Sequence, residues 1–157
     1  MICQQQSCGG RSEVRIRKKP VKVRYMDFTS MYPALFQLMK LWSLLIAERI
    51  ESVDATKEVR RLVDNVNLET LRNSDIWKDM VAIVLTQPDG DVLPVRTHYG
   101  DKQAYNIGIN YLTSKRPLWY ALPDVIASKL LTGKTPKILR VTSLFLKAFN
   151  LVFRQPR

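Results

Sequence analysis

The residues of this chain best suited to chemistry form a short run at positions 27–33, with the sequence Asp-Phe-Thr-Ser-Met-Tyr-Pro. Residues 21–26 before it alternate apolar and basic side chains, as in a β-strand, and residues 31–42 after it carry apolar side chains at helical spacing. A carboxylate at such a junction can cap the helix, a role open to Asp27, Thr29 or Ser30. It can also bind a divalent metal while backbone N–H groups of the turn receive phosphate oxygens. The local pattern leaves both roles open.

The elements that would position Asp27 are two strands and a helix. Residues 13–17 alternate like residues 21–26, so we expect two strands that pair antiparallel, with Asp27 at the end of the second. Apolar residues occupy nearly the whole circumference of the helix predicted over residues 31–42, which is typical of a buried helix. Residues 1–12 have no regular periodicity and are interpreted as an N-terminal arm.

The rest of the chain predicts a mixture of helices and strands. Helices are expected over residues 55–64, with Thr56 as the cap, and over residues 118–131, with shorter ones at 67–71 and 75–78. Residues 81–86 and 91–96 flank Pro88-Asp89-Gly90 and predict a β-hairpin, and further strands are expected at 105–112 and within 136–153. We therefore expect an α+β fold with antiparallel strands packed against helices, forming one partial domain over residues 1–157.

Gly133-Lys134-Thr135 matches the end of a phosphate-binding Walker A loop. The first glycine of that motif is replaced by Ser128, and the run follows a predicted helix instead of preceding one. Termination of the helix by Gly133 explains the run better.

The charge of the chain favours a polyanionic partner. The formal net charge is +11, and residues 11–24 contain seven basic side chains and one acid. Because such a field attracts polyanions whatever the fold, nucleic acid is the leading candidate, and Arg15, Arg17 and Lys22 are candidate DNA contacts. Residues 51–101 are acidic on balance, which favours an inserted helical and hairpin region there.

The cysteine content and hydropathy bear on the compartment. Cys3 and Cys8 lack the further Cys or His residues that a zinc site needs, so we expect two free thiols in a reducing cytoplasm. The beginning of the sequence has neither the basic nor the apolar region of a signal peptide. Polar residues and Pro33 interrupt the apolar run from Met31, so we expect no membrane span.

Residues 27–33 resemble the first palm motif of family B DNA polymerases, of the form Asp-x-x-Ser-(Leu/Met)-Tyr-Pro. Upstream, Gly9-Gly10-Arg11 resembles the Tyr-x-Gly-Gly element of the same family, followed here too by a basic strand that leads to the aspartate. Residues 117–136 resemble a segment of bacterial and phage-like members. The resemblance implies a palm-domain fragment of a DNA-directed DNA polymerase, which transfers deoxynucleotides to a primer 3′-hydroxyl on a template.

The resemblance also implies roles for particular residues. Asp27 would be a catalytic carboxylate that holds Mg²⁺, together with the backbone carbonyl of Phe28. Ser30 and Met31 would direct backbone N–H groups at the deoxynucleoside triphosphate, and Tyr32 would lie under its sugar. Gly9, Gly10 and Arg11 would contact the DNA backbone.

The chain departs from the family pattern in three places. Ser7 replaces the tyrosine of the Gly-Gly element, and neither the Asp-Thr-Asp motif nor the Lys-x-x-x-Asn-Ser-x-Tyr-Gly motif is present. A two-metal reaction needs the second carboxylate, so we expect no activity from this chain without a second polypeptide that supplies these motifs. The alternatives are a non-catalytic basic nucleic-acid-binding module and a subunit of a split polymerase.

Overall fold

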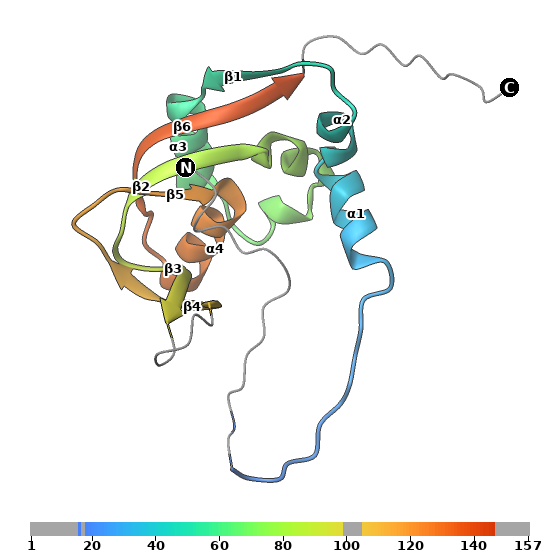
Figure 1. Ribbon diagram of the computed structural model, residues 1–157, viewed down its shortest axis with the longest axis vertical. Coiled ribbons are helices and arrows are strands. Elements are labelled where there is room, and N and C mark those ends of the chain that lie inside the picture. Colours follow the sequence, from blue (N-terminus) through green and yellow to red (C-terminus); the bar gives the residue numbers. More distant parts are fainter. Residues whose placement is uncertain (1–15, 17, 99–104, 147–157) are drawn as a thin grey trace, which may run out of the picture.

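The computed structural model describes residues 16, 18–98 and 105–146, and its centre is an antiparallel sheet of four strands (Figure 1). The strands lie in the order β1 (Ile50–Asp54), β6 (Lys137–Leu146), β2 (Ala82–Gln87) and β5 (Leu118–Ala121). β6 is the last strand described, yet it pairs with β1 on one side and β2 on the other. The expected α+β class, with antiparallel strands packed against helices, is confirmed.

Two helices, α3 (Thr56–Asn65) and α4 (Leu122–Thr132), pack on the sheet and contact each other. Burial along β2 alternates, with Ala82, Val84 and Thr86 buried, because one face of the strand lies under the helices. The buried apolar core consists of Val59, Val63, Val66, Met80, Ala82, Val84, Leu93, Tyr120, Leu122, Val125, Ile126, Ile138 and Val141.

Polar side chains also connect α3 to its neighbours. Arg60 donates to the carbonyl of Ile138 at 2.7 Å, and the N–H of Val141 donates to the hydroxyl of Thr56 at 2.9 Å. Thr56 therefore bonds to β6, and the predicted cap is wrong, because Ala55 occupies the N-cap position. At the other end of α3, the amine of Lys129 on α4 donates to the carbonyl groups of Val63, Asp64 and Val66. The last carbonyl groups of a helix have no N–H donor within the helix. Lys129 supplies a donor to the carbonyls at the end of α3.

A second sheet has two strands, β3 (Asp89–His98) and β4 (Tyr105–Thr113), joined in antiparallel register. The strands expected around Pro88-Asp89-Gly90 are present, but the predicted hairpin is wrong, because β2 and β3 lie in different sheets. β5 and β6 occupy both edges of β2, so no edge remains for β3. The register of β3 and β4 shifts between Asp89 and Asp91, where Gly90 adopts a φ of 72° that favours glycine.

The helix expected over residues 118–131 begins later than predicted. Residues Leu118–Ala121 form β5, which pairs with β2, and α4 begins only at Leu122. Pro123 and Asp124 do lie in its first turn, where proline and negative charge are favourable. Gly133 ends α4 at a φ of 72°, so helix termination accounts for the Gly133-Lys134-Thr135 run.

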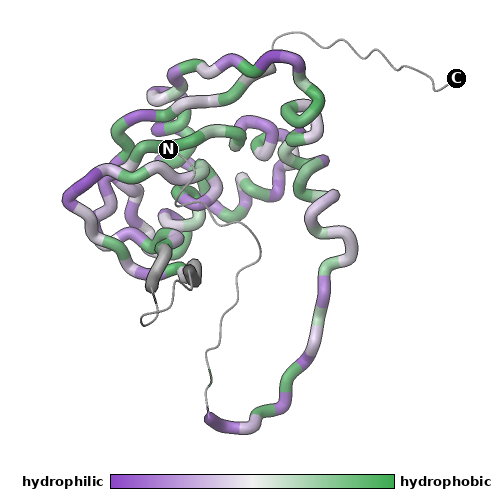
Figure 2. Tube along the Cα trace, viewed as in Figure 1, coloured by the Kyte–Doolittle hydropathy of each residue, from purple (hydrophilic) through white to green (hydrophobic). Residues whose placement is uncertain are grey.

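The segment before α1 is extended and exposed, and it leaves the body of the molecule as the blue loop in Figure 1. The strand predicted over residues 21–26 is wrong, since no described strand pairs with it, although its hydropathy alternates visibly (Figure 2). Of the strand predicted over residues 13–17, only Ile16 is described, and it is exposed. A period-two pattern forms a strand only where a neighbour accepts its hydrogen bonds.

The helix predicted over residues 31–42 is divided into α1 (Met31–Leu38) and α2 (Leu41–Leu45). Lys40 separates them with a φ of 54°, which an α-helix does not accommodate. No residue of either helix is buried, so the prediction of a buried helix is wrong. α1 contacts η3 and α2 contacts β6. Phe36 and Trp42 pack on each other with ring centroids 5.1 Å apart.

Two 3₁₀ helices, η2 (Thr70–Arg72) and η3 (Ser74–Met80), replace the short helices expected near residues 67–71 and 75–78. Asn67 and Thr70 exchange side-chain and backbone hydrogen bonds of 2.9 Å before η2. Residues 51–101, where charge favours an inserted region, supply most of β1 and all of α3, β2 and β3. Among the described residues, no helix has the length and apolar character needed to cross a membrane.

We predict that Lys129→Met lowers the free energy of unfolding by about 2 kcal/mol, because three carbonyl groups lose a charged donor. Chemical denaturation of both proteins measures this difference. The control is Lys57→Met on the exposed face of α3, for which we expect a change within about 0.5 kcal/mol. Equal stability of the Lys129 and Lys57 variants would show that the capping interaction contributes nothing.

We predict that Tyr120→Phe raises the free energy of unfolding at neutral pH by about 1 kcal/mol, because the buried hydroxyl has no hydrogen-bond partner among the described residues. Burial, with the Asp124 charge as the smaller cause, raises the pKa of Tyr120 from 10.0 to about 12. The unfolded chain therefore ionises first, and wild-type stability falls between these pH values. Denaturation at several alkaline pH values should show a smaller loss for the variant, and an equal loss would contradict the assignment.

Candidate metal and nucleic-acid site

Asp27 lies at the end of the exposed extended segment. Phe28 and the turn formed by Thr29 and Ser30 separate it from α1. One of its carboxylate oxygens, Oδ1, accepts the N–H of Phe28 at 2.9 Å. Ser30 occupies the N-cap of α1 in a left-handed conformation, with a φ of 55°, and makes no side-chain capping bond. Neither the Asp27 nor the Ser30 side chain bonds to the N-terminal N–H groups of α1. These two side chains therefore do not have the capping role that the sequence allowed.

The other residues expected at this site surround the beginning of α1. Phe28 is 79% exposed and Tyr32 is 55% exposed, so both are accessible from solvent. The N–H of Ala34 donates to the carbonyl of Ser30 at 3.0 Å and closes the first helical turn. The N–H groups of Met31 and Tyr32 precede that bond and have no acceptor within the helix. They are placed where a helix can receive an anion.

Metal ligands near Asp27 are few. In residues 16, 18–98 and 105–146, no group of three or more His, Cys, Asp or Glu side chains could hold a metal ion. Mg²⁺ commonly binds one or two protein oxygens and keeps several waters, which the Asp27 carboxylate and the Phe28 carbonyl can accommodate. A two-metal site requires a further carboxylate beside them.

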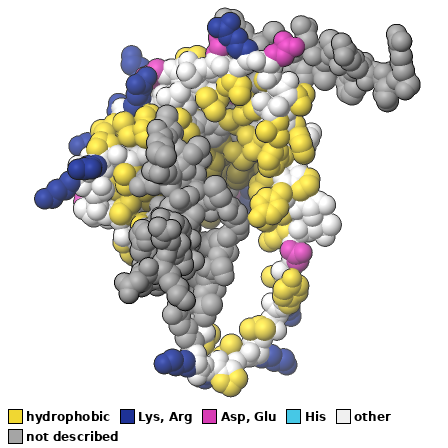
Figure 3. Space-filling model, in the orientation of Figure 1, with side chains coloured by type: hydrophobic (Ala, Val, Ile, Leu, Met, Phe, Trp, Pro, Cys, Tyr) yellow, Lys and Arg dark blue, Asp and Glu magenta, His cyan; other side chains and the backbone are white. Residues whose placement is uncertain are grey.

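The candidate DNA contacts are only partly described. Gly9, Gly10, Arg11, Arg15 and Arg17 lie outside the described residues. Lys22 is exposed on the extended segment, together with Lys18, Lys19 and Arg24. Figure 3 shows basic side chains at the far end of this segment and hydrophobic side chains gathered over α1 and α2. Positive charge and Asp27 therefore lie on the same exposed segment.

Titratable groups with shifted pKa values lie on other elements. Burial raises the pKa of Asp124 in the first turn of α4 above its usual value. Hydrogen bonds from the Thr56 hydroxyl and N–H lower the pKa of Asp54 at the end of β1. Packing around α4 explains the shift of Asp124, and hydrogen bonds at the beginning of α3 explain that of Asp54. Neither residue therefore points to catalysis.

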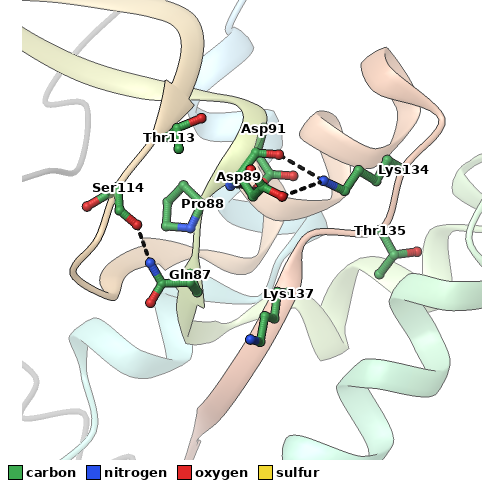
Figure 4. Close-up of a pocket in the computed structure, with 9 residues that line it drawn as sticks. All are labelled: Gln87, Pro88, Asp89, Asp91, Thr113, Ser114, Lys134, Thr135 and Lys137. Carbon is green, nitrogen blue, oxygen red and sulfur yellow. Dashed lines mark hydrogen bonds and ion pairs between the residues drawn. The ribbon is translucent and has the colours of Figure 1, made fainter.

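A pocket of about 420 Å³ lies where β2 leads into β3, and the sequence analysis did not find it (Figure 4). Its lining includes the aspartates Asp89 and Asp91 and the lysines Lys134 and Lys137. The turn at Pro88-Asp89-Gly90 and the end of α4 at Gly133 were visible in the sequence as separate signals. Only the fold shows that these two connections meet.

Comparisons with known proteins return no relative. No family model matches the chain, and neither a curated protein nor a solved structure matches it.

Proposed function

We propose that the chain is a palm fragment of a family B-like DNA polymerase and supplies one of its two metal-binding carboxylates, Asp27. The observation that carries this proposal is the placement of residues 27–33. An exposed aspartate ends an extended segment immediately before the N-terminal turn of α1, and it does not cap that helix. Mg²⁺ bound there would stabilise the negative charge of a transferring triphosphate.

The neighbours of Asp27 support binding of a deoxynucleoside triphosphate. The N–H groups at the beginning of α1 lack helical acceptors, so they are available to phosphate oxygens. Tyr32 is exposed on the same turn, where its ring would pack under the sugar and exclude a 2′-hydroxyl. In this proposal Phe28 contributes its carbonyl to the metal, and Ser30 and Met31 contribute N–H groups to the triphosphate.

The proposal requires a second polypeptide segment that carries the other carboxylate and the lysine motif. The described part of the chain has an apolar surface on which such a segment could pack. Val23, Tyr25 and Met26 are each at least 78% exposed, and no described strand pairs with them. The adjoining helices α1 and α2 have no buried residue. Apolar surface of this kind is typical of an interaction site.

The charge of the same segment supports the proposed contact with DNA. Lys18, Lys19, Lys22 and Arg24 are exposed within seven positions of one another, and the net charge is +11. Contacts of this type neutralise phosphates without reading the base sequence, so binding weakens as salt rises. A primer-template is the polyanion that the polymerase assignment requires.

We predict that Asp27→Asn weakens Mg²⁺-dependent binding of a deoxynucleoside triphosphate roughly tenfold, because the metal loses a charged ligand. Titration calorimetry with and without Mg²⁺ measures the effect. The matched control is Asp64→Asn, an exposed aspartate on α3, which should leave nucleotide affinity unchanged. Salt-dependent DNA binding with no metal-dependent nucleotide binding would instead support the non-catalytic nucleic-acid-binding module.

We predict that the purified chain does not extend a primed template alone. Extension should appear when a polypeptide with the Asp-Thr-Asp and Lys-x-x-x-Asn-Ser-x-Tyr-Gly motifs is added, and Asp27→Ala should abolish it. Primer extension on a gel measures both results. Extension that survives Asp27→Ala would contradict the assigned role of this residue, and the circular dichroism spectrum of the variant would show whether its fold is retained.

A further inference from the structure

The four-stranded sheet has one face turned towards α3 and α4 and a second face turned away from them. Tyr120, Val84 and Val141 are fully buried on the first face, in the core that these helices share. Because side chains alternate along a strand, the neighbours of these residues point to the second face, which we call the outer face. It carries Trp119 and Ala121 of β5, Ile83, Leu85 and Gln87 of β2, and Lys137, Arg140 and Thr142 of β6. Each of these residues is at least partly exposed.

A β-bulge in β6 determines that Arg140 belongs to the outer face. The pairing of β2 with β6 shifts just after Leu85, which is opposite Arg140. Leu139 is the extra residue, and both Leu139 and Arg140 are exposed between the buried Ile138 and Val141. Without the extra residue, strict alternation from Ile138 would turn Arg140 into the core. Bulges commonly redirect a side chain in this way next to a functional surface.

Trp119 and Arg140 lie in one row across the outer face. Both are opposite Leu85, since β2 runs between β5 and β6. Trp119 is partly exposed, and the side chain of Arg140 is 64% exposed. Neighbouring strands are about 4.8 Å apart, so the backbones of β5 and β6 are separated by about 10 Å. Side chains as long as these two can therefore contact one ligand.

Further basic side chains lie at the end of the outer face near the β4–β5 link. Lys137 is exposed and is opposite Gln87. The side-chain amide of Gln87 donates to the carbonyl of Ser114 (Figure 4). This bond brings the exposed Lys115 and Arg116 to the same end of the sheet as Lys137. The outer face thus has a tryptophan with positive charge on two sides of it.

An acidic side chain, Asp54 of β1, also contacts this row. Its Oδ2 lies 3.9 Å from Nε of Arg140, and both side chains are at least 60% exposed. An exposed ion pair of this length contributes little free energy, because water screens both charges. The pair therefore does not prevent Arg140 from binding a phosphate.

The combination of an aromatic ring with basic side chains favours one class of ligand. Duplex nucleic acid can contact the basic side chains, but its bases are stacked on each other. The bases of a single strand are free to stack on an aromatic side chain while the phosphates contact Lys and Arg. The net charge of +11 favours such a polyanion over a neutral partner.

We propose that the outer face binds single-stranded nucleic acid, with one base stacked on Trp119 and the neighbouring phosphates in contact with Arg140 and Lys137. Single-stranded DNA and RNA present the same chemistry to these side chains. The surface includes neither residues 27–33 nor the basic residues at 18–24, so the inference does not depend on the polymerase assignment. Asp27→Ala should leave this binding unchanged.

The test measures the affinity of the full chain for a labelled oligo(dT) by fluorescence anisotropy. Trp119→Leu should weaken binding about tenfold, because one base loses its stacking contact. Trp119→Phe keeps an aromatic ring and should retain most of the affinity. The matched control is Trp42→Leu on α2, which removes an exposed tryptophan elsewhere and should leave the affinity unchanged.

The basic side chains are tested by the dependence of binding on salt. Arg140→Gln and Lys137→Gln should each reduce the slope of log K against log salt concentration by about 0.7, the value for one phosphate contact in a single strand. The control Arg61→Gln changes an exposed arginine of α3, which packs on the other face of the sheet, and should leave the slope unchanged. A duplex of the same length should bind wild type and Trp119→Leu equally.

Several results would overturn the inference. Equal oligo(dT) affinity of wild type and Trp119→Leu would show that no base stacks on this ring, and would favour a protein partner for the outer face. An unchanged salt slope in both the Arg140 and Lys137 variants would show that phosphates do not lie there. Equal weakening of oligo(dT) and duplex by Trp119→Leu would indicate a damaged fold, which circular dichroism checks, or a contact other than stacking. Where the inference holds, at least tenfold tighter binding of oligo(dT) than oligo(U) identifies DNA as the ligand, and the reverse identifies RNA.

Discussion

The fold depends on the position of β6 between β1 and β2. This strand comes last among the described elements, yet both of its edges are paired, and α3 is hydrogen-bonded to it through Arg60 and Thr56. The central sheet cannot close until it is in place. Its partners lie 50 to 96 positions earlier in the sequence, so the core rests on long-range contacts. The loop-closure entropy of such contacts must be met before packing stabilises them.

The occupied edges of β2 explain how the rest of the molecule is divided. Because β5 and β6 flank β2, the chain leaves the first sheet at Pro88 and begins a second one with β3 and β4. That change of sheet creates the corner at Asp89 and Asp91, against which the end of α4 is packed. The pocket is thus a consequence of sheet topology, and its buried carboxylate lies at the point where the β3–β4 register shifts.

The residues proposed for catalysis lie outside this core. Residues 18–28 are exposed, and the helices α1 and α2 have no buried residue. Apolar residues occur in all three segments. The backbone groups of residues 21–26 have no described strand to pair with, and the apolar side chains of α1 and α2 are not buried. Both segments therefore leave groups in water that a folded protein normally pairs or buries. In the proposed polymerase, a partner that supplies strands and a second carboxylate would meet both deficits.

The sequence alone determined the local elements well, because capping, turn and periodicity signals act over a few residues. It predicted α3, β4, the first-turn residues of α4 and the end of α4 at Gly133. It also located the Asp27 motif. The tertiary structure decided what depends on distant partners: that residues 118–121 form a strand beside β2, that β2 and β3 separate, and that residues 21–26 form none. It alone brought Asp91 and Lys137 to one pocket, since their proximity depends on strand pairing, which the sequence does not encode locally.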